Sequence, residues 1–266
     1  MINDLRCTEQ YLAKEQIETW KERNILYNTL WFWLMVKGPD VEYSDAAINE
    51  YKKLKCYAEW KVVEKKAGKR VLNAPIGEIS ADLMTGWWKP FKFFLKLNNK
   101  INRKTCTKQF FDDFGSQLEN MSNEEVSKWM AKEFGRDESA CKKCLEFLKV
   151  VYTGGNMIPI ITNYKSGSTL DGWDTKMLGL IDDELYNSKQ VKSWNKYIQE
   201  VFGSVNEFIN QNKLQHYLSG EKVDLFWDRT IKFGYLKATD QEWKRYFEKV
   251  ESKISYRNEL LNSIEV

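Results

Sequence analysis

The spacing of apolar residues constrains this chain most, because it repeats every three to four residues along most of the length. One such stretch runs from about Glu9 to Val36. Ser122-Asn-Glu-Glu125 and Thr239-Asp-Gln-Glu242 match the capping box, in which side chains satisfy the free N–H groups of a first helical turn. The sequence therefore predicts a mainly α-helical protein whose last helix runs some two dozen residues after Thr239.

Glycine and proline interrupt the helical pattern in the first third of the chain. The stretch from Gly68 to Gly77 is typical of a loop, and a short β-hairpin near residues 60–79 is the one extended element that the pattern allows. Ser80 is expected to cap an aromatic helix over residues 83–97. Pro90 should kink or interrupt that helix, because proline has no backbone N–H and clashes with the preceding turn.

Length and composition indicate one globular domain. The 266 residues are 42% hydrophobic and 30% charged, which excludes disordered and fibrous classes. Residues 153–172 form the longest segment without helical spacing, and a connection of that length is uncommon inside a compact domain. We predict a single, mainly α-helical domain over residues 1–266, with a long central loop at 153–172.

Charge is distributed unevenly along the chain. Residues 51–108 hold 15 basic and 4 acidic side chains, although the whole chain has a net charge of +3. Lysines bind phosphates and aromatic faces stack on unpaired bases, so this segment is a candidate nucleic-acid interface of low base specificity. The alternative is that the aromatic residues form the core and the lysines cover its outer face. The residues assigned to the interface are Lys89, Lys92, Lys96, Trp87 and Trp88.

The single histidine, His216, restricts the enzymes that this chain could be. Serine and cysteine nucleophiles need an imidazole beside them, and no nucleophile motif lies near His216, so an ordinary helix-face histidine is expected. The sequence has no phosphate-binding glycine loop, no dinucleotide-binding glycine pattern and no nucleophile elbow. Paired carboxylates at Asp112-Asp113 and Asp182-Asp183-Glu184 are typical of surface charge. We expect no cofactor and no metal ion.

The number and spacing of the cysteines indicate the cellular compartment of the protein. Cys141-Lys-Lys-Cys144 has the spacing of redox and zinc motifs, but a second ligand pair is missing and the motif lies within a helical pattern, so free thiols are expected. Five cysteines and a start at Met1-Ile-Asn-Asp without a secretory leader favour the cytoplasm. The longest apolar run, Leu30 to Val36, is too short to cross a bilayer.

The segment from Tyr152 to Ile181 carries the most informative local pattern. In a structural interpretation, Gly154 and Gly155 let a helix end, Asn156 hydrogen-bonds the turned backbone, and residues 157–161 enter the core. The order of Tyr-Thr-x-Gly-Asn, an apolar run with proline, and an aromatic, leucine-rich helix resembles uncharacterised bacterial proteins with domains of unknown function.

The same segment resembles, more distantly, the Gly-Asn-Leu segment of HNH-related nuclease domains in phage-restriction proteins. That resemblance implies a loop asparagine at Asn156 and a helical lysine at Lys176. Those nucleases also need a general-base histidine and metal-binding side chains upstream. This chain has no histidine before residue 216, so the base is lost or moved.

Two classes of function remain open. The first is a cytoplasmic interaction protein that binds a protein or a nucleic acid through residues 51–108. Its setting in phage–host conflict rests on the resemblance alone. The alternative is a hydrolase or degenerate HNH-like nuclease centred on the 153–176 segment. The catalytic residues of that alternative would be Asn156, Asp171, Asp174 and Lys176.

Overall fold

The computed structural model describes residues 23–36, 48, 52–64, 70–74, 77–97, 103–161, 189–220, 222–224 and 238–264. Within these residues the protein is mainly helical, as the apolar spacing predicts. The α-helices are α2 (Ile25–Trp31), α4 (Lys55–Ala58), α5 (Trp88–Phe94), α6 (Arg103–Leu118), α7 (Asn123–Phe134), α8 (Glu138–Val150), α10 (Lys189–Phe202), α11 (Val205–Gln211) and α13 (Asp240–Asn262). Short helical turns are η2 (Phe32–Val36), η5 (Gly154–Asn156) and η6 (Gln215–Tyr217).

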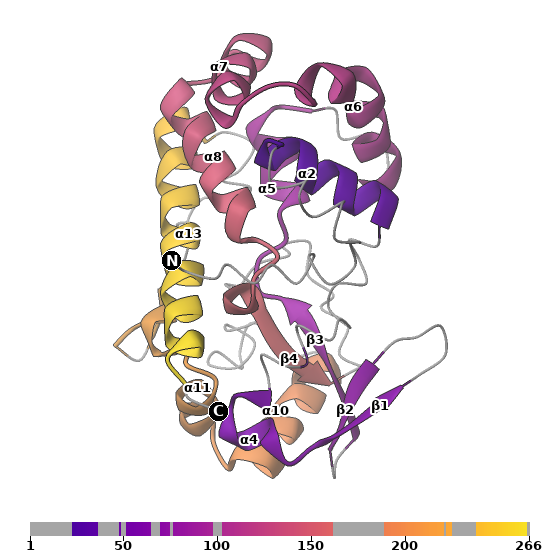
Figure 1. Cartoon of the computed structure of the whole chain (residues 1–266). Coiled ribbons are helices and arrows are strands. Elements are labelled where there is room, and N and C mark those ends of the chain that lie inside the picture. Colours follow the sequence, from indigo (N-terminus) through magenta and orange to yellow (C-terminus); the bar gives the residue numbers. More distant parts are fainter. Residues whose placement is uncertain are drawn as a thin grey trace.

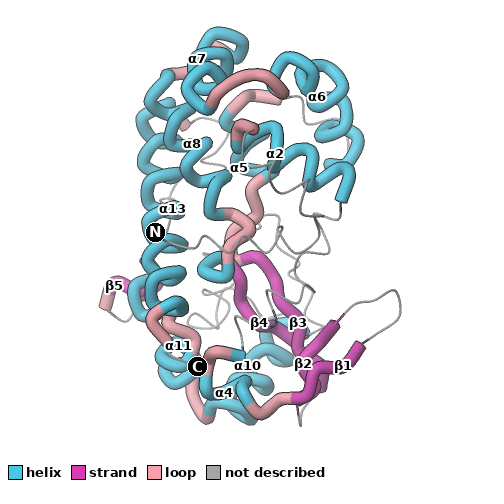
Figure 2. Tube along the Cα trace, viewed as in Figure 1, coloured by secondary structure: helices cyan, strands magenta, loops and turns pink. Residues whose placement is uncertain are grey.

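The described elements gather toward two ends of an elongated molecule (Figures 1 and 2). We call α2, α5, α6, α7 and α8 the helical end. The sheet end consists of strands β1–β4 with α4, α10 and α11. Helix α13 runs along one side and packs against both α8 and η5, so it joins the two ends. The buried apolar side chains of both ends form one continuous core.

Two helix starts confirm their predicted capping boxes. Before α7, the Ser122 hydroxyl accepts a hydrogen bond from the Glu125 N–H at 3.2 Å, and the Glu125 carboxylate accepts one from the Ser122 N–H at 2.7 Å. Thr239 and Glu242 make the same exchange before α13, which is 23 residues long. These signals are reliable because both partners lie within one turn of each other.

Other helix starts differ from the predictions. Within the described part of the helix expected from about Glu9 to Val36, α2 begins after Asn24, whose backbone is extended and whose side chain caps the Tyr27 N–H, and residues 9–22 lie outside the described residues. Ser80 caps no helix, because it lies in strand β3. Helix α5 is shorter than predicted, and Pro90 does not kink it. Pro90 occupies the first turn, where a backbone N–H has no partner within the helix.

The sheet is larger than the predicted hairpin. Strands β1 (Lys61–Glu64) and β2 (Arg70–Ala74) form that hairpin, and β3 (Gly77–Leu83) and β4 (Met157–Ile161) extend it to four antiparallel strands in the order β1-β2-β3-β4. In the β3–β4 register, Leu83 lies opposite Met157 and Ile79 opposite Ile161. A second pair, β5 (Leu218–Ser219) and β6 (Lys222–Val223), forms a small ribbon.

The beginning of the predicted central loop therefore has regular structure. Residues 154–156 form η5 and residues 157–161 form β4, while residues 162–172 lie outside the described residues. Strand β4 was missed because its partner, β3, lies more than seventy residues away in sequence, and no local pattern records that pairing. No described helix combines the length and the apolar character needed to cross a membrane.

Candidate functional site

Asn156, the centre of the predicted catalytic segment, is fully buried and bonded to main-chain atoms. Its Nδ2 donates to the carbonyl oxygens of Thr85 at 3.0 Å and Val151 at 2.7 Å, and its Oδ1 accepts from the Thr85 N–H at 3.0 Å. The Asn156 carbonyl accepts from the Met84 N–H at 2.7 Å. Both amide donors are thus used to hold the end of α8 and η5 against the segment that follows β3.

The buried guanidinium of Arg257, on α13, donates hydrogen bonds to main-chain carbonyls on the other side of the same turn. Its Nη1 donates to the carbonyls of Gly155, at 3.1 Å, and Met157, and its Nε donates to the carbonyl of Asn212 at 3.0 Å. Asn258 adds a second link from α13, because its Oδ1 accepts from the Gly155 N–H at 2.6 Å. Sequence reasoning missed both residues, since neither belongs to a recognisable motif.

The close approach of η5 to α13 requires glycine at residue 155. A Cβ at this position would lie 2.3 Å from the carbonyl oxygen of Ile254 and 2.6 Å from Oδ1 of Asn258, both closer than side-chain carbons come. The glycine therefore serves the packing of η5 on α13. The structural interpretation of the 153–161 segment explains these contacts without a bound substrate.

The other residues of the predicted catalytic group, Asp171, Asp174 and Lys176, lie outside the described residues. The structure therefore does not bring them together with Asn156. Within the described ranges, no group of three or more histidine, cysteine, aspartate or glutamate side chains could hold a metal ion.

Trp87 and Trp88, predicted to stack on bases, lie in the core. They are 0% and 2% exposed, and the Trp87 indole N–H donates to the Tyr152 hydroxyl at 2.7 Å. Their rings also pack on each other and on Phe91. A base cannot reach a ring that is already enclosed, so the assignment of these two residues to a binding surface is wrong.

The three lysines assigned to the same interface lie on α5 and just after its end. Lys89 and Lys92 are half-buried and Lys96 is exposed, while Trp88, Phe91 and Phe94 of the same helix are buried. Lys89 and Lys92 lie one turn apart on α5, and Lys96 follows the end of the helix, where the Leu97 N–H donates to the Lys92 carbonyl, so the three lysines lie within eight residues of chain. We call these three residues the α5 lysine face.

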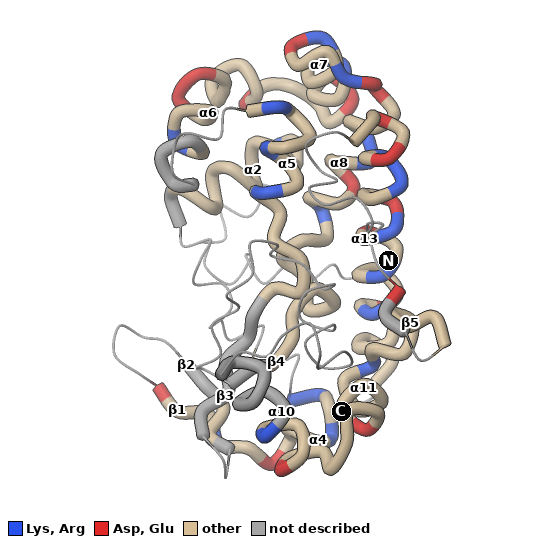
Figure 3. Tube along the Cα trace, turned by 180° about the vertical axis from the view of Figure 1, so that it is seen from behind, with Lys and Arg blue, Asp and Glu red and all other residues tan. Residues whose placement is uncertain are grey.

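The α5 lysine face differs in its electrostatic environment from the lysines of neighbouring helices. Helix α5 contains no acidic residue, and neither Lys92 nor Lys96 pairs with a described carboxylate. In contrast, Lys128, Lys142 and Lys143 each pair with a glutamate three or four residues away on their own helix. Figure 3 shows this contrast, with blue but no red along α5 and both colours along α7 and α8.

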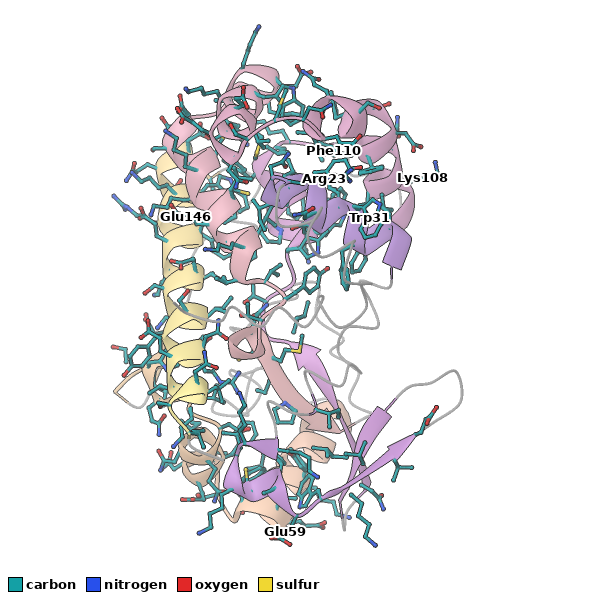
Figure 4. The ribbon with its side chains drawn as sticks, in the orientation of Figure 1. Arg23, Trp31, Glu59, Lys108, Phe110 and Glu146 are labelled. Atoms are coloured by element: carbon teal, nitrogen blue, oxygen red, sulfur yellow. The ribbon has the colours of Figure 1, made fainter. Side chains whose placement is uncertain are left out.

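The described parts of the basic segment 51–108 lie at two ends of the molecule. Helix α4 and strand β1 lie at the sheet end, whereas α5 and α6 lie at the helical end (Figure 1). In Figure 4, Glu59 marks the first of these ends, and Lys108 lies at the outer edge of α6, where it pairs with Asp112. The described basic residues of this segment are therefore divided between the two ends of the molecule, and the α5 lysine face is the part that the sequence located.

One aromatic residue beside the lysine face remains partly accessible. Phe93 is half-buried, and Nζ of Lys92 lies 5.3 Å from the centre of its ring. A partly exposed ring flanked by cations is the arrangement on which an unpaired base can stack. The sequence pattern did not separate Phe93 from the buried aromatic residues around it, because burial depends on how α5 packs on its neighbours.

His216 lies in η6 beside α13, away from the α5 lysine face. Its Nε2 lies 2.9 Å from the carbonyl oxygen of Lys253, which makes Nε2 the protonated nitrogen, and its ring contacts Tyr217 and Tyr256. Burial lowers the pKa of His216 to about 4, with the positive charges of Lys253 and Arg257 acting in the same direction. His216 is neutral at pH 7 and lies half-buried in the turn η6, whereas the sequence favoured a histidine on a helix face.

Cys141 and Cys144 are buried, free thiols on α8. Burial raises the pKa of Cys141 to about 12 and that of Cys144 well above its usual value. A thiol with a raised pKa is a poor nucleophile and a poor metal ligand at neutral pH. Both cysteines serve as small core residues in this structure.

Comparison of the chain with models of known protein families, with curated proteins and with solved structures finds no significant match.

Replacement of Asn156 distinguishes a structural from a catalytic role. Asn156→Asp keeps the shape of the side chain but removes both Nδ2 donors and buries a charge, so we expect it to lower the free energy of unfolding by about 3 kcal/mol or more. The measurement is urea unfolding followed by tryptophan fluorescence. The matched control, Asn120→Asp, changes an exposed residue and should alter stability by less than about 0.5 kcal/mol. Equal stability of the two variants would contradict a structural role for Asn156.

His216 should make stability depend on pH. Because its folded pKa lies below the unfolded value of 6.5, its contribution is fully present above pH 6.5 and is lost as the pH falls toward 4. For a partly buried group we expect a loss of about 1–2 kcal/mol between pH 7 and pH 4.5. His216→Gln retains an amide donor but does not titrate, so its unfolding free energy should fall less over this range. Parallel pH profiles for wild type and variant would contradict the prediction.

Proposed function

We propose that this chain is a non-enzymatic cytoplasmic protein that binds single-stranded nucleic acid through the α5 lysine face. The observation that carries the proposal is that Lys89 and Lys92 on α5 and Lys96 just after it lie within eight residues of chain that contain no acidic residue. Phosphate groups would balance the positive charge that these three lysines bring together.

The chemistry of the face favours a ligand recognised by its backbone. Lysine ammonium groups act as point charges and contact phosphates without reading base edges. Phe93 could add base stacking, which is tolerant of sequence because every base has an aromatic face. These properties support binding of limited sequence preference to an unpaired strand.

An enzyme centred on the 153–176 segment receives less support. Both Nδ2 donors of Asn156 are bonded to carbonyl oxygens inside the core, so this side chain offers no donor to a substrate. The proposal therefore assigns Asn156 a structural role and places function at α5.

The biological setting that we propose is phage–host conflict in bacteria. It rests on the likeness of the Tyr152–Ile181 segment to phage-restriction proteins and on no feature of α5. Binding at the lysine face and action against phage are accordingly separate parts of the proposal, and each needs its own experiment.

Binding should depend on salt and on the three lysines together. For a fluorescent single-stranded oligonucleotide, we expect the logarithm of the affinity to fall with the logarithm of salt concentration with a slope of about −2, since three phosphates are neutralised and each releases about 0.7 counterions. Lys89→Glu, Lys92→Glu and Lys96→Glu in combination should weaken binding of every sequence about equally. Fluorescence anisotropy at several salt concentrations measures both effects.

The matched control reverses three exposed lysines at a distance from α5. Lys128→Glu, Lys132→Glu and Lys142→Glu together change the net charge by the same amount and should weaken binding far less. Circular dichroism checks that both triple variants retain the helical fold. Salt-independent binding, or equal effects of the two triple variants, would reject the α5 lysine face as a nucleic-acid site and leave a protein partner as the interaction to pursue.

Expression of the chain in a bacterial host should reduce phage plaque numbers if the proposed setting is right. The triple reversal on α5 should restore those numbers, whereas the control triple variant should protect like wild type. Plaque counts that do not change on expression of the wild-type chain would exclude protection against the phages tested.

A further inference from the structure

Two lysines in this structure adopt the left-handed backbone conformation that favours glycine. Lys96 has a φ of 57° and Lys213 a φ of 58°, and the other described residues with positive φ are glycines. Lys96 follows α5 and Lys213 follows α11. In both places the next residue closes the helix, because Leu97 N–H donates to the Lys92 carbonyl and Leu214 N–H to the Ile209 carbonyl, each at 2.9 Å.

The backbone at these helix ends would be more stable with glycine. A side chain in the left-handed region brings Cβ close to the following carbonyl, and glycine avoids this contact. A lysine at such a position therefore lowers stability unless its side chain compensates elsewhere. Strained residues of this kind concentrate at functional sites, where the function of the side chain maintains them.

The surroundings of the two lysines differ although their backbones match. Lys96 is exposed and completes the α5 lysine face, four residues after Lys92 and seven after Lys89. Lys213 is half-buried at the sheet end, where its charge and that of Glu207 both act on Cys56. A positive charge after a helix complements the partial negative charge of its C-terminus in both cases, so that benefit does not distinguish them.

We propose that Lys96 is a phosphate-binding residue, kept in a strained left-handed conformation because its charge completes the α5 lysine face. The proposal rests on the function proposed above and deepens it by assigning one phosphate contact to one residue. Lys96 forms no ion pair with a described carboxylate, so its ammonium group is available to an anion. Lys213 has the same backbone strain at the sheet end, away from α5, and we assign it no role in binding.

Glycine substitution separates backbone strain from charge. Lys96→Gly and Lys213→Gly should each raise the Tm by about 2–4 °C. Each replacement removes the Cβ that strains a left-handed backbone conformation. Only Lys96→Gly should weaken binding of a fluorescent oligodeoxythymidylate. At 0.1 M salt we expect about a fivefold loss, together with a decrease of about 0.7 in the salt slope, as for one lost phosphate contact.

Two further variants place a neutral or a positively charged side chain at residue 96. Lys96→Asn is neutral and tolerates left-handed backbone, so it should bind as weakly as Lys96→Gly. Lys96→Arg retains the positive charge and should bind like wild type. This pattern would support a phosphate contact and would not arise from a purely structural residue.

The outcomes distinguish this inference from the proposed function. If wild type binds the oligonucleotide in a salt-dependent manner and the triple reversal on α5 weakens it, the proposed function stands. If Lys96→Gly then binds with wild-type affinity and an unchanged salt slope, the role of Lys96 is rejected. Equal loss of binding in Lys213→Gly would also reject it, because the effect would then follow from the helix end and not from the lysine face.

Discussion

The buried carbonyl oxygens between the end of α8 and the start of β4 impose the constraint on which the fold depends. The chain must turn there inside the core, and a buried carbonyl without a hydrogen bond costs on the order of 1–3 kcal/mol. Asn156 donates hydrogen bonds to the carbonyls of Thr85 and Val151 at 3.0 and 2.7 Å. Arg257 donates one to the carbonyl of Gly155 at 3.1 Å from the other side of the turn. Because Arg257 lies on α13, the same bonds attach the long helix to the sheet end.

This arrangement explains why the segment looked functional in the sequence. Two glycines, an asparagine and a proline close together are typical of loops that bind ligands, and they are equally typical of a chain that must turn within a core. Close packing at Gly155 and the inward direction of the Asn156 amide favour the second explanation. The chemistry that remains available on the surface lies instead at α5, where buried aromatic residues hold a face of lysines outward.

The features predicted correctly are those whose partners are close in sequence. The capping boxes at Ser122 and Thr239 involve residues three positions apart, and the β1–β2 hairpin joins neighbouring strands. Predictions failed where local signals were ambiguous or partners were distant. Ser80 has the chemistry of a cap, but its backbone belongs to β3, and the pairing of β3 with β4 spans a long stretch of chain.

The amino-acid sequence by itself determined the mainly helical class, the two capping boxes and the closeness of three lysines along the chain, and it allowed the hairpin as a possibility. Each of these follows from interactions within a few residues. Only the tertiary structure decided that Trp87 and Trp88 are enclosed while Phe93 is half-buried, and that the described parts of the basic segment lie at two ends of the molecule. Burial and surface charge depend on which distant elements pack together, and Arg257, which bonds to a turn about a hundred residues earlier, is the clearest case.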